Sequence, residues 1–232
     1  MKNKTIAIIT ARGGSKRIPK KNIKEFCGKP IILYSIEAAL QSGCFDEVMV
    51  STDDVEIAEL AKAAGASVPF MRSAENANDF ATTIDVIAEV LEKYRELGRA
   101  YESFACIYPT APFVTAERLQ HAMALLQGDG VDAVIPIVQY SFPPQRSFCL
   151  NDRYIAYNWP ENMLKRSQDL APMYHDAGQF YCGRTERFFE QKKLVMDKTV
   201  PLILSDLEVQ DIDNPEDWSI AEIKYRLLNK LL

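Results

Sequence analysis

The sequence has little histidine and no ordered pattern of cysteine. Its two histidines, His121 and His175, lie far apart, and its five cysteines are scattered without any C-x-x-C spacing. A zinc site needs several such ligands at short, regular spacing. A disulfide framework needs paired cysteines, and an odd number at irregular positions does not suggest one. We therefore expect no zinc site, and we expect reduced thiols of the kind found in cytoplasmic proteins.

Long apolar runs are also missing. No run approaches the ~18–20 apolar residues of a membrane-spanning helix, so we expect no membrane association. The apolar run at 5–10 follows a short basic start, but Arg12 interrupts it and no small-residue cleavage site follows. It therefore predicts a first strand rather than a signal peptide. The composition, 47% hydrophobic and 25% charged in 232 residues, is typical of one globular domain, without repeats or low-complexity tracts.

Positive charge is in the minority overall, yet it is concentrated in one segment. The formal net charge is −5, but residues 12–24 contain six basic side chains and no acid. An acidic chain is not expected to have nucleic acid as its main partner, whereas one local cluster of this kind fits a small anionic ligand. The alternative is a solvated, lysine-rich surface loop. The basic residues are Arg12, Lys16, Arg17, Lys20, Lys21 and Lys24.

Short apolar runs alternate with segments of helical periodicity along most of the chain. This order predicts an α/β fold, a Rossmann-like, mostly parallel sheet with helices on both faces. Strands are expected at 5–10, 47–52, 67–71, 103–109 and 132–138, and helices at 30–43, 53–65, 82–98 and 115–130.

Two of the predicted helices begin with clear capping signals. Asp53 is expected to be the N-cap of the helix at 53–65, because an acid three residues later completes a capping box. The last helix is expected to begin with Asn214 as N-cap, Pro215 as its first residue and Asp217 as its third. These signals place the loops before both helices.

The alternation stops after residue 138. Residues 139–174 are rich in proline, aromatic and charged residues and have no clear period. A structureless loop of this length is unusual in a compact domain. We expect an excursion that packs against something else, such as a second subunit. The sheet is expected to resume at 177–183 and 200–206.

The basic segment directly follows the first predicted strand. Ligands of parallel α/β sheets bind beyond the carboxyl ends of the strands, so this loop lies at the expected ligand edge. Gly13 and Gly14 would let the backbone approach an anion closely, and Ser15 adds a hydroxyl donor. Arginine offers two-pronged contacts to phosphate and lysine a compact charge. The combination suits a triphosphate, although neither the Walker A pattern nor G-x-G-x-x-G is present.

The stretch at 11–36 resembles the N-terminal signature of the CMP-sugar synthetases, the acylneuraminate cytidylyltransferase family. The resemblance implies transfer from CTP to an acidic nine-carbon keto-sugar, with pyrophosphate leaving. Pseudaminic acid is the expected sugar; N-acetylneuraminate, legionaminate and 3-deoxy-manno-octulosonate are the alternatives. The matching segments are ARGGSKRIPKKNIKEFCGKPIILYSI, STDDVEIAELAKAAGASVPFMRSAENANDFATTIDVI, YPTAPFVTAERLQ, RSQDLAPMYHDAGQFYCG and QDIDNPEDW, which cover most of the chain.

The resemblance also implies an organisation and a nucleotide site. It implies one nucleotidyltransferase domain at 1–232, a dimerisation and acceptor-binding arm inserted at 139–176, and a homodimer. Lys21 is implied to lie nearest the reacting phosphate and to stabilise developing charge there, with Arg12 and Asp211 also catalytic. Taken alone, Arg72 would be read as a surface arginine. The residues implied to bind CTP are Ala11, Arg12, Gly13, Ser15, Lys16, Lys21, Asn22, Arg72, Asp79 and Thr82, the last two near cytosine.

Two acids near the end of the chain are candidate magnesium ligands. Asp211 and Asp213 in DIDNPED would share one face of an extended strand. Mg²⁺ prefers one or two carboxylates together with phosphate oxygens and water. The resemblance places a metal-binding pair here. The alternative, that the segment only caps the last helix, explains Asn214 but not Asp211. A carboxylate here is also a candidate acceptor for the hydroxyl proton, directly or through water, and this choice stays open.

The resemblance implies a sugar site in the late part of the chain. Arg166 is the preferred partner of the sugar carboxylate and Arg146 the second choice. A lone histidine such as His175 is equally well read as structural. The residues implied to bind the sugar are Tyr108, Arg166, Gln168, Asp169, His175 and Gln179.

The sequence departs from the neuraminate branch of the family in YPTAPF. Tyr108 stands where glutamine is expected, and Phe113 where arginine is expected. Both changes replace a long polar side chain near the expected cleft with an aromatic one, which favours a less hydroxylated, deoxygenated sugar. Two other readings of the chain remain: a sugar-1-phosphate nucleotidylyltransferase, and a non-catalytic nucleotide- or RNA-binding module that uses the basic loop.

Overall fold

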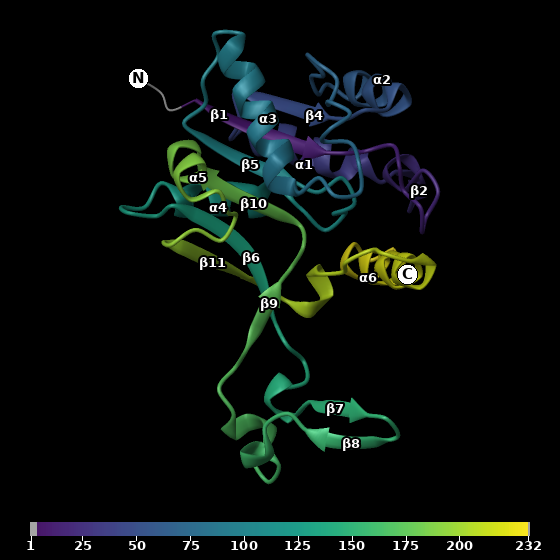
Figure 1. Cartoon of the computed structure of the whole chain (residues 1–232). Helices are drawn as coiled ribbons and strands as arrows, with labels where there is room; N and C mark the ends of the chain where they lie inside the picture. Colours follow the sequence, from purple (N-terminus) through teal and green to yellow (C-terminus); the bar gives the residue numbers. More distant parts are fainter. Residues whose placement is uncertain (1–3, 232) are drawn as a thin grey trace.

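A seven-stranded sheet forms the centre of the computed structural model, which describes residues 4–231 (Figure 1). Six strands follow the order β11-β6-β10-β5-β1-β4, and β9 pairs with the end of β6. The strands are β1 (Thr5–Thr10), β4 (Glu47–Ser51), β5 (Ser103–Ile107), β6 (Ala133–Gln139), β9 (Tyr174–Asp176), β10 (Phe180–Arg184) and β11 (Thr199–Leu204).

The sheet is mostly parallel, as predicted. β1 is parallel to both β4 and β5, and β11 is parallel to β6. β9 and β10 are the exceptions: β10 lies antiparallel between β5 and β6, and β9 is antiparallel to β6. β10 is reached from β9 by a short turn rather than by a crossover helix.

Helices cover both faces of the sheet, which confirms the predicted layer order. Ala7 and Ile9 of β1 pack in the same cluster as α1, α2 and α4, whereas Ile6 and Ile8 pack with α3 and α5. The alternation of these residues along β1 follows from the pleat. No helix within residues 4–231 is long and apolar enough to cross a membrane. The helices are α1 (Ile32–Ser42), α2 (Val55–Ala63), α3 (Thr83–Glu96), α4 (Ala116–Leu126), α5 (Thr185–Gln191) and α6 (Pro215–Leu228).

Two local predictions need correction. The N-cap of α2 is Asp54, not Asp53: the Asp54 carboxylate accepts from the backbone N–H of Glu56 at 2.8 Å. Asp53 has another partner, described below. The strand expected at 67–71 is also wrong, since only Ser67 forms an isolated bridge to β4. Pro69 lies in this segment and cannot donate to a ladder, which explains why pairing stops.

The last helix folds back onto the N-terminal part of the chain. Asn214 and Asp217 form the predicted capping box of α6, with Pro215 as its first residue. Trp218 of α6 packs against Phe26, with ring centroids 5.5 Å apart. This contact holds residues 211–213, the acidic segment before α6, close to the basic loop. The short elements here are η1 (Lys21–Ile23), β2 (Glu25–Phe26), β3 (Lys29–Pro30) and η5 (Asp206–Glu208).

The excursion predicted after residue 138 is an arm that projects from the sheet (Figure 1). The end of β6 and strand β9 form its stalk, where Gln139 pairs with Tyr174. A hairpin of β7 and β8 lies at its far end. The arm exposes large apolar side chains, including Phe142 and Leu164. Its elements are η2 (Pro144–Arg146), β7 (Phe148–Asn151), β8 (Tyr154–Tyr157), η3 (Pro160–Asn162) and η4 (Ser167–Asp169).

Candidate active site

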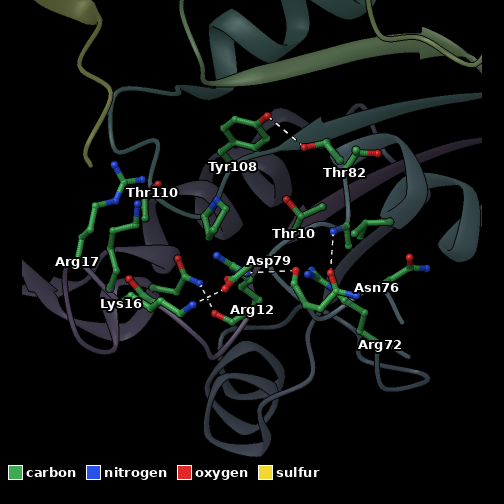
Figure 2. A pocket seen from close by; sticks show the side chains of 18 of the residues that line it. Thr10, Arg12, Lys16, Arg17, Arg72, Asn76, Asp79, Thr82, Tyr108 and Thr110 are labelled. Carbon is green, nitrogen blue, oxygen red and sulfur yellow. Dashed lines mark hydrogen bonds and ion pairs between the residues drawn. The ribbon is translucent and has the colours of Figure 1, made fainter. Parts of the chain in front are cut away.

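A cavity of about 500 Å³ opens beyond the carboxyl ends of β1 and β5 (Figure 2). Thr10, the last residue of β1, and Tyr108, directly after β5, both line it. The basic loop therefore lies at the edge of the sheet where the sequence placed it. The predicted residues that line the cavity are Arg12, Ser15, Lys16, Lys21, Asn22, Arg72, Asp79, Thr82, Tyr108 and Asp213.

Buried polar contacts fix the path of the basic loop. Asn22, which is buried, donates from Nδ2 to the Arg12 carbonyl at 2.7 Å. The N–H of Ala11 donates to the Ser51 carbonyl at 3.0 Å, so the backbone continues β1 by one residue. Ala11 and Asn22 thus shape the loop through contacts inside the protein, and of the two only Asn22 also lines the cavity.

Gly13 is placed where no larger residue fits. Its N–H donates to Asp53 Oδ1 at 2.9 Å, which explains why Asp53 does not cap α2. A Cβ atom on Gly13 would lie 2.6 Å from Asp54 Oδ2. Glycine is therefore required by the close approach of the loop to the start of α2. Gly13 is not among the residues that line the cavity.

Three cations on the cavity wall, Arg12, Lys16 and Arg17, are paired with carboxylates from distant parts of the chain (Figure 2). Arg12 Nη1 lies 2.7 Å from Asp79 Oδ1, and Lys16 pairs with the other oxygen of the same carboxylate. Arg17 Nη2 lies 2.8 Å from Asp213 Oδ1. Hydrogen bonds from Lys16 and then Arg12 lower the pKa of Asp79. Asp79, expected near cytosine, here contacts the groups expected to bind phosphate.

Lys21 is the cation that lies deepest against the acidic segment. Its Nζ donates to the Ile212 carbonyl at 2.7 Å, between the two candidate metal ligands. Burial lowers the pKa of Lys21, and the nearby charges of Asp213 and Asp211 partly oppose this. The contact joins residues 191 positions apart, so the loop and the segment before α6 form one site.

Asp211 and Asp213 lie on either side of Ile212, but not in the strand that the sequence predicted. Residues 211–213 are outside any strand, and only Asp213 lines the cavity. Burial raises the pKa of Asp211, and the charge of Asp213 raises it further. Across residues 4–231, no three acidic, histidine or cysteine side chains gather as a metal cage. Two repelling carboxylates beside the basic loop fit Mg²⁺, which prefers one or two carboxylates together with phosphate oxygens and water.

Arg72 is not a surface arginine. It is 8% exposed and lines the cavity. Its Nε donates to Ser51 Oγ at 3.0 Å, which ties it to the end of β4. Burial lowers the pKa of Arg72. Thr82, its neighbour on the cavity wall, caps α3 by accepting from the Asp85 N–H at 3.2 Å.

Several residues of the cavity wall were not assigned from the sequence. Arg17 belongs to the basic segment 12–24, so its position could have assigned it to the site as it did Lys16. Asn76 and Asn78 lie shortly before Asp79, but amide side chains in a loop give no periodic signal by which to predict a role. The unassigned wall residues also include Thr10, Thr83, Val86, Pro109 and Thr110.

The predicted sugar-binding residues do not converge on this cavity. Arg166 and Asp169 pair with each other on the arm, with Arg166 Nε 2.8 Å from Asp169 Oδ2. Gln168 lies beside Asp169 in the short helix η4, and His175, which is exposed, lies on β9. Gln179 is buried and holds the backbone of Tyr108. Apart from Tyr108, none of the six lines the cavity of its own chain, so their binding roles stay predictions.

Phe113 is not at the cavity either. It is buried in the cluster beneath α6, with its ring centroid 6.3 Å from that of Tyr225. The phenylalanine at this position, where arginine is expected in the neuraminate branch, therefore packs in the core. The prediction that this change removes a polar group from the cavity is wrong. Tyr108 does line the cavity, and its hydroxyl lies 3.2 Å from Thr83 Oγ1.

Two solved structures share this fold. One is a CMP:2-keto-3-deoxy-manno-octonic acid synthetase complexed with CTP, with a TM-score of 0.69 and 20% identity, covering 99% of this chain and 100% of that one. The other is a 4-diphosphocytidyl-2C-methyl-D-erythritol synthase from Anaerococcus prevotii, with a TM-score of 0.61 and 14% identity, covering 97% of this chain and 99% of that one.

Sequence relatives are more similar. The chain is 39% identical to a pseudaminic acid cytidylyltransferase of Campylobacter jejuni, covering 97% of both proteins. It is 36% identical to a CMP-N,N'-diacetyllegionaminic acid synthase of Legionella pneumophila, covering 94% of both. The family described as Cytidylyltransferase matches residues 6–211. The chain therefore belongs to the cytidylyltransferase family and is a nucleotidyltransferase.

Proposed function

We propose that this protein transfers CMP from CTP to pseudaminic acid and releases pyrophosphate. The observation that carries the proposal is the meeting of the basic loop with the segment 211–213, through the contact of Lys21 with the Ile212 carbonyl. The contact brings the basic loop beside Asp211 and Asp213, an arrangement that supports binding of a triphosphate together with its counter-ion. The choice of sugar is supported by relatives that are 39% and 38% identical and are named pseudaminic acid cytidylyltransferases.

The reaction needs positioning and charge neutralisation rather than a covalent enzyme intermediate. The anomeric hydroxyl of the sugar attacks the α-phosphorus of CTP, a new P–O bond forms, and the bond to pyrophosphate breaks. Arg12 and Lys16 are suited to the phosphate chain because they lie on the cavity wall. Lys21 is half-buried, so its charge acts where water screens it less.

Asp211 and Asp213 would hold Mg²⁺ in this proposal. The bound ion would supply positive charge to the phosphates and relieve the repulsion between the two carboxylates. Asp211 is also a candidate to accept the hydroxyl proton, directly or through water, because it adjoins the contact between Lys21 and the Ile212 carbonyl. Arg17 would orient Asp213, which it contacts at 2.8 Å.

We further propose that the protein is a homodimer of the cytoplasm, where CTP is made. The arm exposes Phe142 and Leu164 on the same projection that carries Arg166. A partner surface would cover these apolar groups. It would also let Arg166 of one chain approach the cavity of the other, with Gln168, Asp169 and His175 nearby.

The test is pyrophosphate release with CTP and Mg²⁺. Pseudaminic acid, N-acetylneuraminate, a legionaminic acid and 3-deoxy-manno-octulosonate run in parallel, with a sugar phosphate as a separate acceptor. We expect turnover to be fastest with pseudaminic acid and to stop with EDTA. A preference for another acid sugar would overturn the substrate, and turnover only with the sugar phosphate would overturn the acceptor class.

A further inference from the structure

Glu89 of α3 holds the loop between α2 and α3, although it does not line the cavity itself. Its Oε1 accepts from the backbone N–H of Ser73 at 2.8 Å, and its Oε2 accepts from Asn76 Nδ2 at 2.6 Å. Lys93, one turn further along α3, pairs with the same carboxylate. The side chain of Glu89 is only 10% exposed. A nearly buried carboxylate therefore fixes this part of the loop against the helix.

The contact with Glu89 sets the direction of the Asn76 amide. Burial raises the pKa of Glu89, but hydrogen bonds from Lys93, Asn76 and Ser73 outweigh burial and leave the pKa below its ordinary value. Glu89 is therefore ionised, and an ionised carboxylate can only accept hydrogen bonds. The amide of Asn76 must then turn its NH₂ group towards Glu89 and its oxygen away. The backbone is held as well, because the N–H of Asn76 donates to the Ser73 carbonyl at 3.1 Å.

Asn76 lines the cavity, and its amide oxygen is left for a ligand. In the part of the chain that the structure describes, no group donates a hydrogen bond to its Oδ1. The other amide on this wall, Asn78, differs in this respect. Its Oδ1 already accepts from the N–H groups of Phe80 and Ala81, at 2.7 and 3.0 Å. Of these two amides, Asn76 is therefore the one whose oxygen can accept from a ligand.

Asn76 also lies far from the basic loop within the cavity. Figure 2 shows Lys16 and Asn76 on opposite sides of the pocket, with Arg12 and Asp79 between them. A nucleoside triphosphate whose phosphates bind the basic loop would extend its base towards Asn76. The free amide oxygen is thus placed to meet the edge of the base.

We propose that Asn76 recognises the Watson–Crick edge of cytosine, and that Glu89 is a positioning residue that sets the direction of its amide. This inference rests on the proposed function, in that CTP is the nucleotide, and it adds a basis for the choice of base. The N4 amino group of cytosine can donate to Oδ1, whereas uracil presents an acceptor, O4, at the same place. To suit uracil the amide would have to turn over, which would bring Oδ1 against the carboxylate of Glu89.

The direct test is Asn76→Ala, which removes the amide and leaves the contacts of Glu89 with Ser73 and Lys93 in place. Isothermal titration calorimetry of the full chain with CTP and with UTP, without any sugar, measures both affinities. We expect the wild type to bind CTP more tightly than UTP. In Asn76→Ala the Kd for CTP should rise about 10-fold, the discrimination that one well-made base contact provides, while the Kd for UTP should change less than about 2-fold.

Glu89→Ala tests the positioning role by itself. It frees the amide of Asn76, which can then turn its NH₂ group towards O4 of uracil. The ratio of the Kd for UTP to the Kd for CTP should therefore shrink by about 5- to 10-fold. A loop that was merely loosened would weaken both nucleotides equally and leave the ratio unchanged. Glu92→Ala is the matched control, because it removes the same charge from an exposed position of α3 that does not line the cavity.

The calorimetry keeps this inference apart from the proposed function, because it needs no acceptor sugar. A protein that bound CTP but did not turn over pseudaminic acid would overturn the proposed sugar and still give the two affinities. Three results would overturn the inference. They are a wild type that binds CTP and UTP equally or binds neither, an Asn76→Ala variant that weakens both nucleotides equally or not at all, and a Glu89→Ala variant that keeps the wild-type ratio.

Discussion

The surface around the cavity and the surface of the arm differ in the contacts that their exposed side chains make. Around the cavity, exposed charges have partners within the chain, as in Arg12 with Asp79 and Arg17 with Asp213. On the arm, large apolar side chains face solvent: Phe142 is 87% exposed and Leu164 90%. These charges at the cavity thus have partners in the chain, whereas Phe142 and Leu164 on the arm are left uncovered by the residues that the structure describes.

This difference separates two requirements of the site. The proposed phosphate side of the cavity is assembled from one chain, because the loop and the segment before α6 meet through Lys21. Arg166, which we propose to bind the sugar carboxylate, lies on the arm and does not line the cavity of its own chain, so the proposed sugar side needs a second chain. A change in the domain should therefore act on phosphate chemistry, and a change in the arm should act on assembly.

The largest effect is expected from Lys21→Ala. It removes a half-buried cation from the segment that contains both acids, so kcat should fall by about 10²–10³-fold, as for other lost charge-stabilising donors. The fall is measured by pyrophosphate release at saturating CTP. Lys20→Ala is the matched control, because Lys20 pairs with Glu56 and does not line the cavity. Equal losses in both variants, or full activity of Lys21→Ala, would contradict the assigned role.

The second effect tests the arm. The double variant Phe142→Ser, Leu164→Ser removes two exposed apolar side chains, each of which gains about 1.5–3 kcal/mol when buried. We expect the dimer to weaken by at least about 100-fold in Kd, measured by sedimentation equilibrium. Val55→Ser, at another exposed apolar position in the sheet domain, is the control. A wild type that sediments as a monomer with full activity would show that the arm serves another purpose.

A smaller effect concerns the paired charges of the domain. Burial raises the pKa of Glu47, but hydrogen bonds from Ser67, Arg99 and Tyr94 outweigh it and leave the pKa below its ordinary value. A lowered folded-state pKa means that Glu47 stabilises the protein above its unfolded pKa. This contribution is lost as the pH falls through the folded pKa.

The matching variant is Glu47→Gln, which should cost about 1–3 kcal/mol at neutral pH and nothing below both pKa values. Urea unfolding at neutral and acid pH measures the difference. Glu161→Gln, at an exposed position on the arm, is the control and should cost little stability at neutral pH. If both variants lost equal stability at neutral pH, the contrast between domain and arm would not hold for charges.

Periodicity and capping signals were enough to predict most of this fold, because they act over a few residues. Asn214, Pro215 and Asp217 begin α6 as predicted. The strand wrongly expected at 67–71 has a local cause, Pro69, but other features of the fold depend on distant contacts. Asp53 and Asp54 are both suitable caps, and the choice depends on the Gly13 N–H, which takes Asp53. The path of β10 likewise depends on how the arm returns to the sheet.

The candidate site was predicted less evenly than the fold. The basic loop could be found because its charges are adjacent in sequence, and its place after a strand gives the ligand edge. The partner of those charges could not, because Asp79 lies 67 residues from Arg12 and no spacing rule connects them.

The smallest expected effect concerns Asp79 and decides between its two roles. Its carboxylate contacts Arg12 and Lys16, so it competes with phosphate for the same cations. Exposed ion pairs of this kind contribute little, so Asp79→Asn should lower KM for CTP by only about 2- to 5-fold. Glu56→Gln removes the same charge from a pair outside the cavity and corrects for the overall change in potential. A rise in KM instead would mean that Asp79 holds the nucleotide, as a residue beside cytosine would, and that its pairing with the basic loop gives way when the base binds.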